Sequence, residues 1–152
     1  MVFPVLGCNT MYNRNYQIAP EESSVQVAHN LCYKMMYNSS KNRIYFTIQG
    51  FWKNKDAVPE FLEDWSKTLR LVSPNFAVLT DMSSMITHPQ ELNDLHAESH
   101  KLLVEAGVAK TAHVIPLDKI ASLQVNAIAE QTGIAARNFN SLEEADGWLD
   151  AL

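Results

Sequence analysis

The sequence predicts an α/β fold, a single domain with a four- to five-stranded, mixed and mostly parallel sheet and about four helices. Residues 42–84 contain an alternating strand, an amphipathic helix and an apolar strand, an order that forms one βαβ unit. Strand and helix patterns then continue to alternate as far as the C-terminus. With 152 residues, 47% of them hydrophobic, the chain has the size of one domain and can bury a proper core.

The first part of the chain is expected to be an arm followed by a hairpin. Residues 1–24 follow neither a helical nor a strand period, so we expect an irregular arm before one domain at 25–152. Over residues 31–37 the large side chains fall on odd positions, which is the period of a strand. A polar turn at 38–42 and a second alternating strand at 43–49 complete an antiparallel hairpin.

A helix and a buried strand follow the hairpin. Asn54 or Asp56 is the expected N-cap of the helix, and Pro59 fits its first turn. The apolar residues of this helix recur with helical spacing at Val58, Phe61, Leu62, Trp65 and Leu69. The continuous apolar run at 76–79 is typical of a strand that is covered on both faces.

The last third of the sequence continues the alternation. The remaining expected elements are, in order, a helix that begins near Thr87 or His88 and ends before Gly107, a strand at 112–117, a helix at 123–131, a strand at 135–139 and a terminal helix from 141. Asp118 or Ser122 can cap the helix at 123–131. Ser141 and Glu144 form a capping box that opens the terminal helix.

Charge and cysteine content exclude several classes of protein. The net charge of -5 and the scattered basic residues argue against nucleic acid as the main partner. The sequence contains no run of 18 apolar residues, the length that a membrane-spanning helix needs. Cys8 and Cys32 form no metal-binding pair, which fits a reducing cytoplasm. Residues 5–8 resemble a lipoprotein cleavage box, but the leader is short and uncharged, so we expect no lipid anchor unless the native chain starts upstream.

Four local patterns together resemble a known family. They are Ile48-Gln49-Gly50-Phe51, the strand 78–84 of type VLTDMSS, the strand 112–115 of type AHVI, and the segment 137–149 with a Phe, a capped helix and a Trp-Leu pair. Their order is similar to the STAS-like family, and within it to the SpoIIAA-like group. The resemblance covers roughly residues 31–152, and it implies an α/β fold and a regulatory role.

The resemblance also raises the question of phosphorylation. Antagonists of anti-sigma factors in this family carry a phosphorylatable Ser at the start of the helix that follows the strand. Here that position reads Met-Ile-Thr-His-Pro at 85–89. Ser83 and Ser84 come earlier, directly after the strand, and they are the candidates for phosphorylation in this chain.

The candidate binding site is a rim at the carboxyl ends of the strands, where ligands of open α/β sheets bind. Its residues are Phe51 and Trp52 after one strand, and Asp81, Ser83, Ser84 and His88 after the next. Such a rim could hold a protein partner or a small anionic or amphipathic ligand. The alternative, which we favour for the Asp and Ser side chains, is that they hydrogen-bond the backbone of their own turn.

Histidines and aromatic residues give no strong metal or cofactor signal. His96 and His100 are four residues apart on a helix, a spacing that can bind zinc, but the intervening Glu is misplaced for a zinc protease. We therefore expect no metal and no cofactor. By spacing, His96 borders the apolar stripe and His100 points to solvent, while His113 is expected to be a hydrogen-bonded core residue.

Three functional hypotheses follow. The first is a cytoplasmic, non-enzymatic module that binds a partner or ligand at the rim. The second is a small enzyme with a cleft that uses His88, Asp81 or Ser83, although no catalytic motif is present. The third is a homodimer formed through the first hairpin edge and the aromatic arm with Tyr12 and Tyr16.

Overall fold

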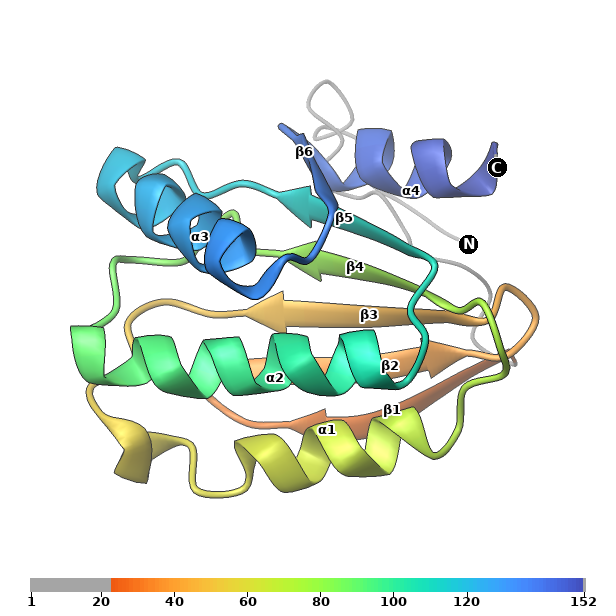
Figure 1. Ribbon diagram of the computed structural model, residues 1–152, viewed down its shortest axis with the longest axis horizontal. Coiled ribbons are helices and arrows are strands. Elements are labelled where there is room, and N and C mark those ends of the chain that lie inside the picture. Colours follow the sequence, from red (N-terminus) through yellow and green to blue (C-terminus); the bar gives the residue numbers. More distant parts are fainter. Residues whose placement is uncertain (1–22, 152) are drawn as a thin grey trace, which may run out of the picture.

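The computed structural model describes residues 23–151. They form one mixed sheet with helices on both faces (Figure 1). The α/β prediction is confirmed, but the prediction of four to five strands is wrong because the sheet has six, in the order β1-β2-β3-β4-β5-β6. The strands are β1 (Ser24–His29), β2 (Tyr33–Asn38), β3 (Arg43–Ile48), β4 (Ala77–Asp81), β5 (Lys110–Val114) and β6 (Ala136–Phe139).

The strand that the sequence analysis missed is β1, which pairs antiparallel with β2. The chain turns at Asn30, whose side-chain oxygen accepts hydrogen bonds from the backbone N–H groups of Cys32 (2.8 Å) and Tyr33 (2.9 Å). Leu31, which the analysis assigned to a strand, lies at this turn and is 96% exposed. Val25 and Val27 before the turn have odd numbers, as do Leu31, Tyr33, Met35 and Tyr37 from the turn onward, so the period of two continues through the turn without a break.

The rest of the sheet follows the predicted pattern. β2 and β3 form the expected antiparallel hairpin, and β3 to β6 run parallel. The helices are α1 (Phe61–Leu69), α2 (Asn93–Glu105), α3 (Lys119–Thr132) and α4 (Leu142–Asp150). Residues of α1, α2 and α3 share one core with the sheet, and α4 packs on the opposite face (Figure 1).

Alternation along the central strands divides side chains between these two cores. Val78 of β4 faces α1 to α3, and its neighbour Leu79 faces α4. On β5, Ala112 and Val114 face α4. His113 therefore points to the α1–α3 side, where a polar ring enters a mainly apolar layer.

The helix starts confirm two of the predicted caps. The side chain of Asp118 accepts hydrogen bonds from Ile120 N and Ala121 N at the start of α3, and that of Ser141 accepts from Glu144 N at the start of α4. The prediction of Asn54 or Asp56 for the first long helix is wrong, because α1 begins at Phe61 without a side-chain cap and Asn54 caps the short 3₁₀ helix η4 (Lys55–Ala57) instead. The predicted start of α2 at residues 87 or 88 is wrong. Pro89 has an extended ψ of 148°, and α2 begins only at residue 93 after a short 3₁₀ turn, η5 (Gln90–Leu92).

No helix within residues 23–151 is both long and apolar enough to cross a membrane. The predicted arm residues Tyr12 and Tyr16, and the cleavage box at 5–8, lie outside the described residues.

A buried ion pair fixes α4 to the sheet. Arg43 Nη1 lies 2.6 Å from Asp146 Oδ1, and both side chains are buried. Tyr45 donates a hydrogen bond of 2.7 Å to the same carboxylate oxygen. At the edge of this network, Asp150 Oδ1 lies 2.9 Å from Arg43 Nη1 and 2.9 Å from Lys41 Nζ. The network joins β3 to a helix about 100 residues later in the sequence.

We expect Asp146→Ala to lower the free energy of unfolding by about 3 kcal/mol or more, because it leaves the Arg43 guanidinium buried without its main partner. Lys41→Ala, at the exposed end of the same network, is the matched control and should cost less than about 1 kcal/mol. Urea unfolding followed by circular dichroism measures both. Equal effects of the two substitutions would contradict this assignment of the buried pair.

Candidate functional site

Three loops at the carboxyl ends of β3, β4 and β5 form one continuous rim. The backbone N–H of Ile86 donates to Gly50 O (3.1 Å), which joins the first two loops. Gln124 of α3 then joins the second loop to the third, because its side chain accepts from His88 N (3.1 Å) and donates to His88 O (3.0 Å). We call this edge the carboxyl rim, comprising residues 50–51, 83–87 and 117–123.

Asp81, Ser83 and Ser84 lie at this edge and hydrogen-bond locally. Asp81 Oδ1 accepts from the backbone N–H of Ser83 (3.1 Å) and from its hydroxyl (2.8 Å). The Ser84 hydroxyl donates to Ile48 O at 3.4 Å. Both serines are exposed, and the Asp81 carboxylate belongs to the turn that presents them.

Trp52 and His88, which the sequence analysis placed on the rim, are buried beneath it. Their exposed fractions are 0% and 2%. The two rings stack with centroids 4.7 Å apart, and Trp52 Nε1 donates to Cys32 O at 2.9 Å. Gly50 has φ of +61°, a backbone conformation that favours glycine. Of the next two residues, Phe51 is exposed and Trp52 is buried.

His96 of α2 completes this buried stack. His88 Nδ1 and His96 Nε2 lie 3.1 Å apart, so one imidazole donates its proton to the other. Burial lowers the pKa of His88 to about 4 and that of His96 to about 3. Both rings are therefore neutral near pH 7.

His100 does not point freely to solvent as predicted. It is half-buried, and its Nδ1 lies 2.9 Å from the hydroxyl oxygen of Thr132 on α3. Burial lowers its pKa to about 4. No group of three or more His, Cys, Asp or Glu side chains among residues 23–151 could hold a metal ion.

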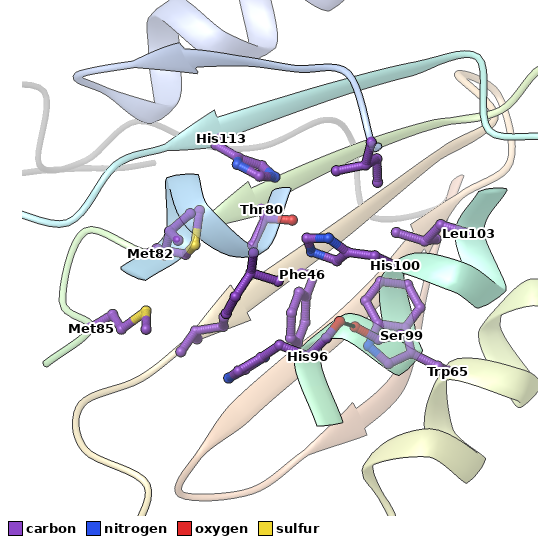
Figure 2. Close-up of a pocket in the computed structure, with 14 residues that line it drawn as sticks. Phe46, Trp65, Thr80, Met82, Met85, His96, Ser99, His100, Leu103 and His113 are labelled. Atoms are coloured by element: carbon purple, nitrogen blue, oxygen red, sulfur yellow. Dashed lines mark hydrogen bonds between the residues drawn. The ribbon is translucent and has the colours of Figure 1, made fainter. Parts of the chain in front are cut away.

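Below the rim, between the sheet and helices α1 to α3, lies a cavity of about 40 Å³ (Figure 2). We call it the histidine cavity. Most of its lining is apolar, and within the described part of the chain no Asp, Glu, Lys or Arg side chain lines it. Its polar lining consists of Trp65, Thr80, His96, Ser99, His100 and His113.

Two ring nitrogens at this cavity, His113 Nδ1 and Trp65 Nε1, have no hydrogen-bond partner among residues 23–151. The expectation that His113 would be a hydrogen-bonded core residue is therefore wrong for this nitrogen. Burial lowers the pKa of His113 to about 3, so this ring is neutral too. The spacing of the histidines placed His96 correctly beside the apolar stripe. Nothing in the sequence indicated that residues from α1, α2 and β5 would share one cavity.

The three residues of the hypothetical enzyme do not form a catalytic set. The Ser83 hydroxyl donates to Asp81, whereas the imidazole of His88 faces His96 and Gly50 O below the rim. Among the residues that the structure describes, no hydrogen bond joins His88 to Ser83 or Asp81.

The rim carries five large apolar side chains in contact with solvent. Their exposed fractions range from 51% to 88%, and they are Phe51, Ile86, Leu117, Ile120 and Leu123. They come from all three loops and from the first two turns of α3 (Figure 1).

Comparisons with known proteins add a fold neighbour. No family model matches this sequence, and no curated protein is significantly similar to it. Among solved structures, the chain is similar to an uncharacterised protein from Shewanella loihica PV-4, described as a DUF3478 family member with a SpoIIAA-like fold. The two are 17% identical with a TM-score of 0.48, and the match covers 80% of this chain and 98% of that one.

The buried histidines predict that stability falls with acid. Their pKa values in the folded state lie below the ordinary value of 6.5 that applies once the chain unfolds. The unfolded chain thus binds more protons between about pH 4 and pH 6.5, and each histidine contributes a slope of about 1.4 kcal/mol per pH unit. This stability is fully present above about pH 6.5 and is lost as the pH falls.

Urea unfolding at about pH 7 and at about pH 5.5 measures this slope. His100→Gln should reduce the slope. His29→Gln, which replaces an exposed histidine on β1, is the control and should leave it unchanged. A free energy of unfolding that stays constant over this range would contradict neutral, buried imidazoles.

Proposed function

We propose that this chain is a cytoplasmic, non-enzymatic binding module that docks a protein partner on its carboxyl rim. The observation that carries the proposal is the gathering of five exposed apolar side chains on one edge of the sheet. Single exposed apolar residues are ordinary on a protein surface, whereas a group of them indicates an interaction site.

The contacts between the loops support a preformed surface. Phe51 follows Gly50, whose carbonyl accepts a hydrogen bond from the backbone N–H of Ile86. Leu123 precedes Gln124, whose side chain bonds both the backbone N–H and the carbonyl of His88. These bonds hold the three loops in fixed positions relative to one another. A rigid apolar surface loses little conformational entropy when a partner binds.

The charges beside this surface favour an acidic, amphipathic partner segment. Lys53, Lys55 and Lys119 are exposed, and their ammonium groups have no ion-pair partner among the described residues. Two of the neighbouring acids are already engaged, because Glu91 accepts from Lys55 N and Asp118 caps α3. An anionic membrane surface fits less well, since recognition of anionic lipids is marked by clusters of about four to eight Lys or Arg residues, and this surface has three lysines beside it.

Ser83 and Ser84 give this surface a means of regulation. Both are exposed on the loop that contributes Ile86. A phosphoryl group on either would add about two negative charges and would repel an acidic partner. The enzyme hypothesis has less support, because the imidazole of His88 is buried away from Ser83.

The test uses a defined peptide of about 18 residues with leucines on one helical face and glutamates on the other. We expect the Leu117→Glu/Leu123→Glu variant to bind it at least about tenfold more weakly than the wild-type chain. Val104→Glu and Leu71→Glu replace exposed apolar residues at the opposite edge and are the matched controls. Isothermal titration calorimetry measures the affinities.

Undiminished binding by the double variant would refute the rim as the docking surface. A lysine version of the peptide that binds equally well would refute the acidic partner. Stronger association with phosphatidylserine vesicles than with the peptide would refute a protein partner and indicate that the rim binds a membrane surface.

A further inference from the structure

We propose that a surface pocket at the amino ends of β5 and β6 binds a small molecule that carries a phosphate monoester group. The pocket has a volume of about 340 Å³, and its lining includes Lys110 of β5, Arg137 of β6 and Trp148 of α4. We call it the cation pocket. It lies at the end of the parallel strands opposite to the carboxyl rim, so this site does not depend on the docking of a partner there.

The two cationic side chains of the pocket are neighbours on one face of the sheet. Ala112 of β5 pairs with Arg137 of β6, and Lys110 lies two residues before Ala112 on the same strand. Because side chains alternate along a strand, all three point to the face that α4 covers (Figure 1). Two positive charges are thus held close together, and an anion between them would relieve their repulsion.

The indole of Trp148 holds both cations at the pocket. Lys110 Nζ lies 5.5 Å from the centroid of the indole ring, and the guanidinium carbon of Arg137 lies 5.4 Å from it. The same guanidinium carbon lies 5.4 Å from the centroid of the Phe139 ring. Such contacts restrain a flexible side chain without neutralising its charge, and they leave N–H donors for a ligand.

Neither cation of the pocket is neutralised by a protein carboxylate. Within residues 23–151, no Asp or Glu forms an ion pair with Lys110 or Arg137. By contrast, Lys41 and Arg43, which also contact α4, are paired with Asp150 and Asp146. The cation pocket is therefore a place of local positive charge on a chain whose net charge is -5.

The chemistry of the lining selects the class of ligand. Arginine binds a phosphate group through two parallel N–H donors, and a lysine ammonium binds a further oxygen as a point charge. A phosphate monoester carries about two negative charges above neutral pH and so matches both cations, whereas a carboxylate carries one.

The walls and the size of the pocket indicate that the phosphate is attached to a small apolar body. Three alanines and the indole of Trp148 form most of the remaining lining. The volume of about 340 Å³ falls within the range of roughly 300–1,000 Å³ that is usual for small-molecule sites. A free phosphate ion would leave the apolar part of this lining without contact.

The test is a titration with phenyl phosphate at about pH 8, where this probe is a dianion. Nuclear magnetic resonance follows the indole N–H signal of Trp148, which Trp148→Phe identifies by its loss. We expect a saturable shift of this signal at millimolar probe, and about fivefold weaker binding by Arg137→Gln and by Lys110→Gln. Arg70→Gln and Lys101→Gln replace exposed cations at α1 and α2, on the other face, and should bind as the wild type does.

Two matched compounds test the charge and the body of the ligand. Phenyl sulfate is a monoanion of nearly the same shape and should bind at least about fivefold more weakly, as should inorganic phosphate, which lacks the apolar body. No saturable shift at millimolar phenyl phosphate, equal binding of either matched compound, or unchanged affinity in both pocket variants would overturn the proposal. Equal weakening by the α1 and α2 controls would reduce the effect to the overall charge of the chain and would overturn it as well.

Discussion

The buried stack of Trp52, His88 and His96 is the constraint on which the carboxyl rim of this protein depends. It joins the loop after β3, the loop after β4 and helix α2 through ring contacts and one shared proton. Burial favours the neutral form of both imidazoles, and two charged rings at 3.1 Å would repel each other strongly in this buried site. The positions of the loops above it follow from this packing.

The two faces of the sheet solve the problem of buried polar groups differently. On the α4 face, Arg43 and Asp146 are both charged, and each offsets the desolvation of the other. On the α1–α3 face, the polar rings of the histidine cavity are buried without an ion pair, and two of their nitrogens have no partner among the described residues. The first arrangement fixes a helix in place, whereas the second leaves hydrogen-bonding capacity in the interior.

Most of the fold could be predicted because its signals are local. Capping by Asp118 and Ser141, and the alternation in β3, require only neighbours in the sequence. β1 was not predicted as a separate strand, because Leu31 continues the odd-numbered pattern through a turn that Asn30 forms with its side chain. The start of α2 was misplaced because Pro89 suits a first helical turn as well as the extended segment that it occupies.

The site was harder to predict because it depends on direction and on distant contacts. The sequence located the strand-end loops, yet it could not show that Trp52 turns inward after Gly50 while Phe51 turns outward. Nor could it bring together His113 and Trp65, which are 48 positions apart (113 minus 65) and belong to different layers of the fold. Such proximity is a property of tertiary packing, and no local period records it.

The loop that follows β4 belongs to two surfaces at once. Met82 and Met85 form part of the cavity wall, while Ile86, the next residue, faces solvent. A shift of the methionines therefore moves the backbone that presents Ile86, and a protein that grips Ile86 restrains the methionines. Any resulting coupling between the interior and the outer edge is reciprocal, with the same free energy in both directions.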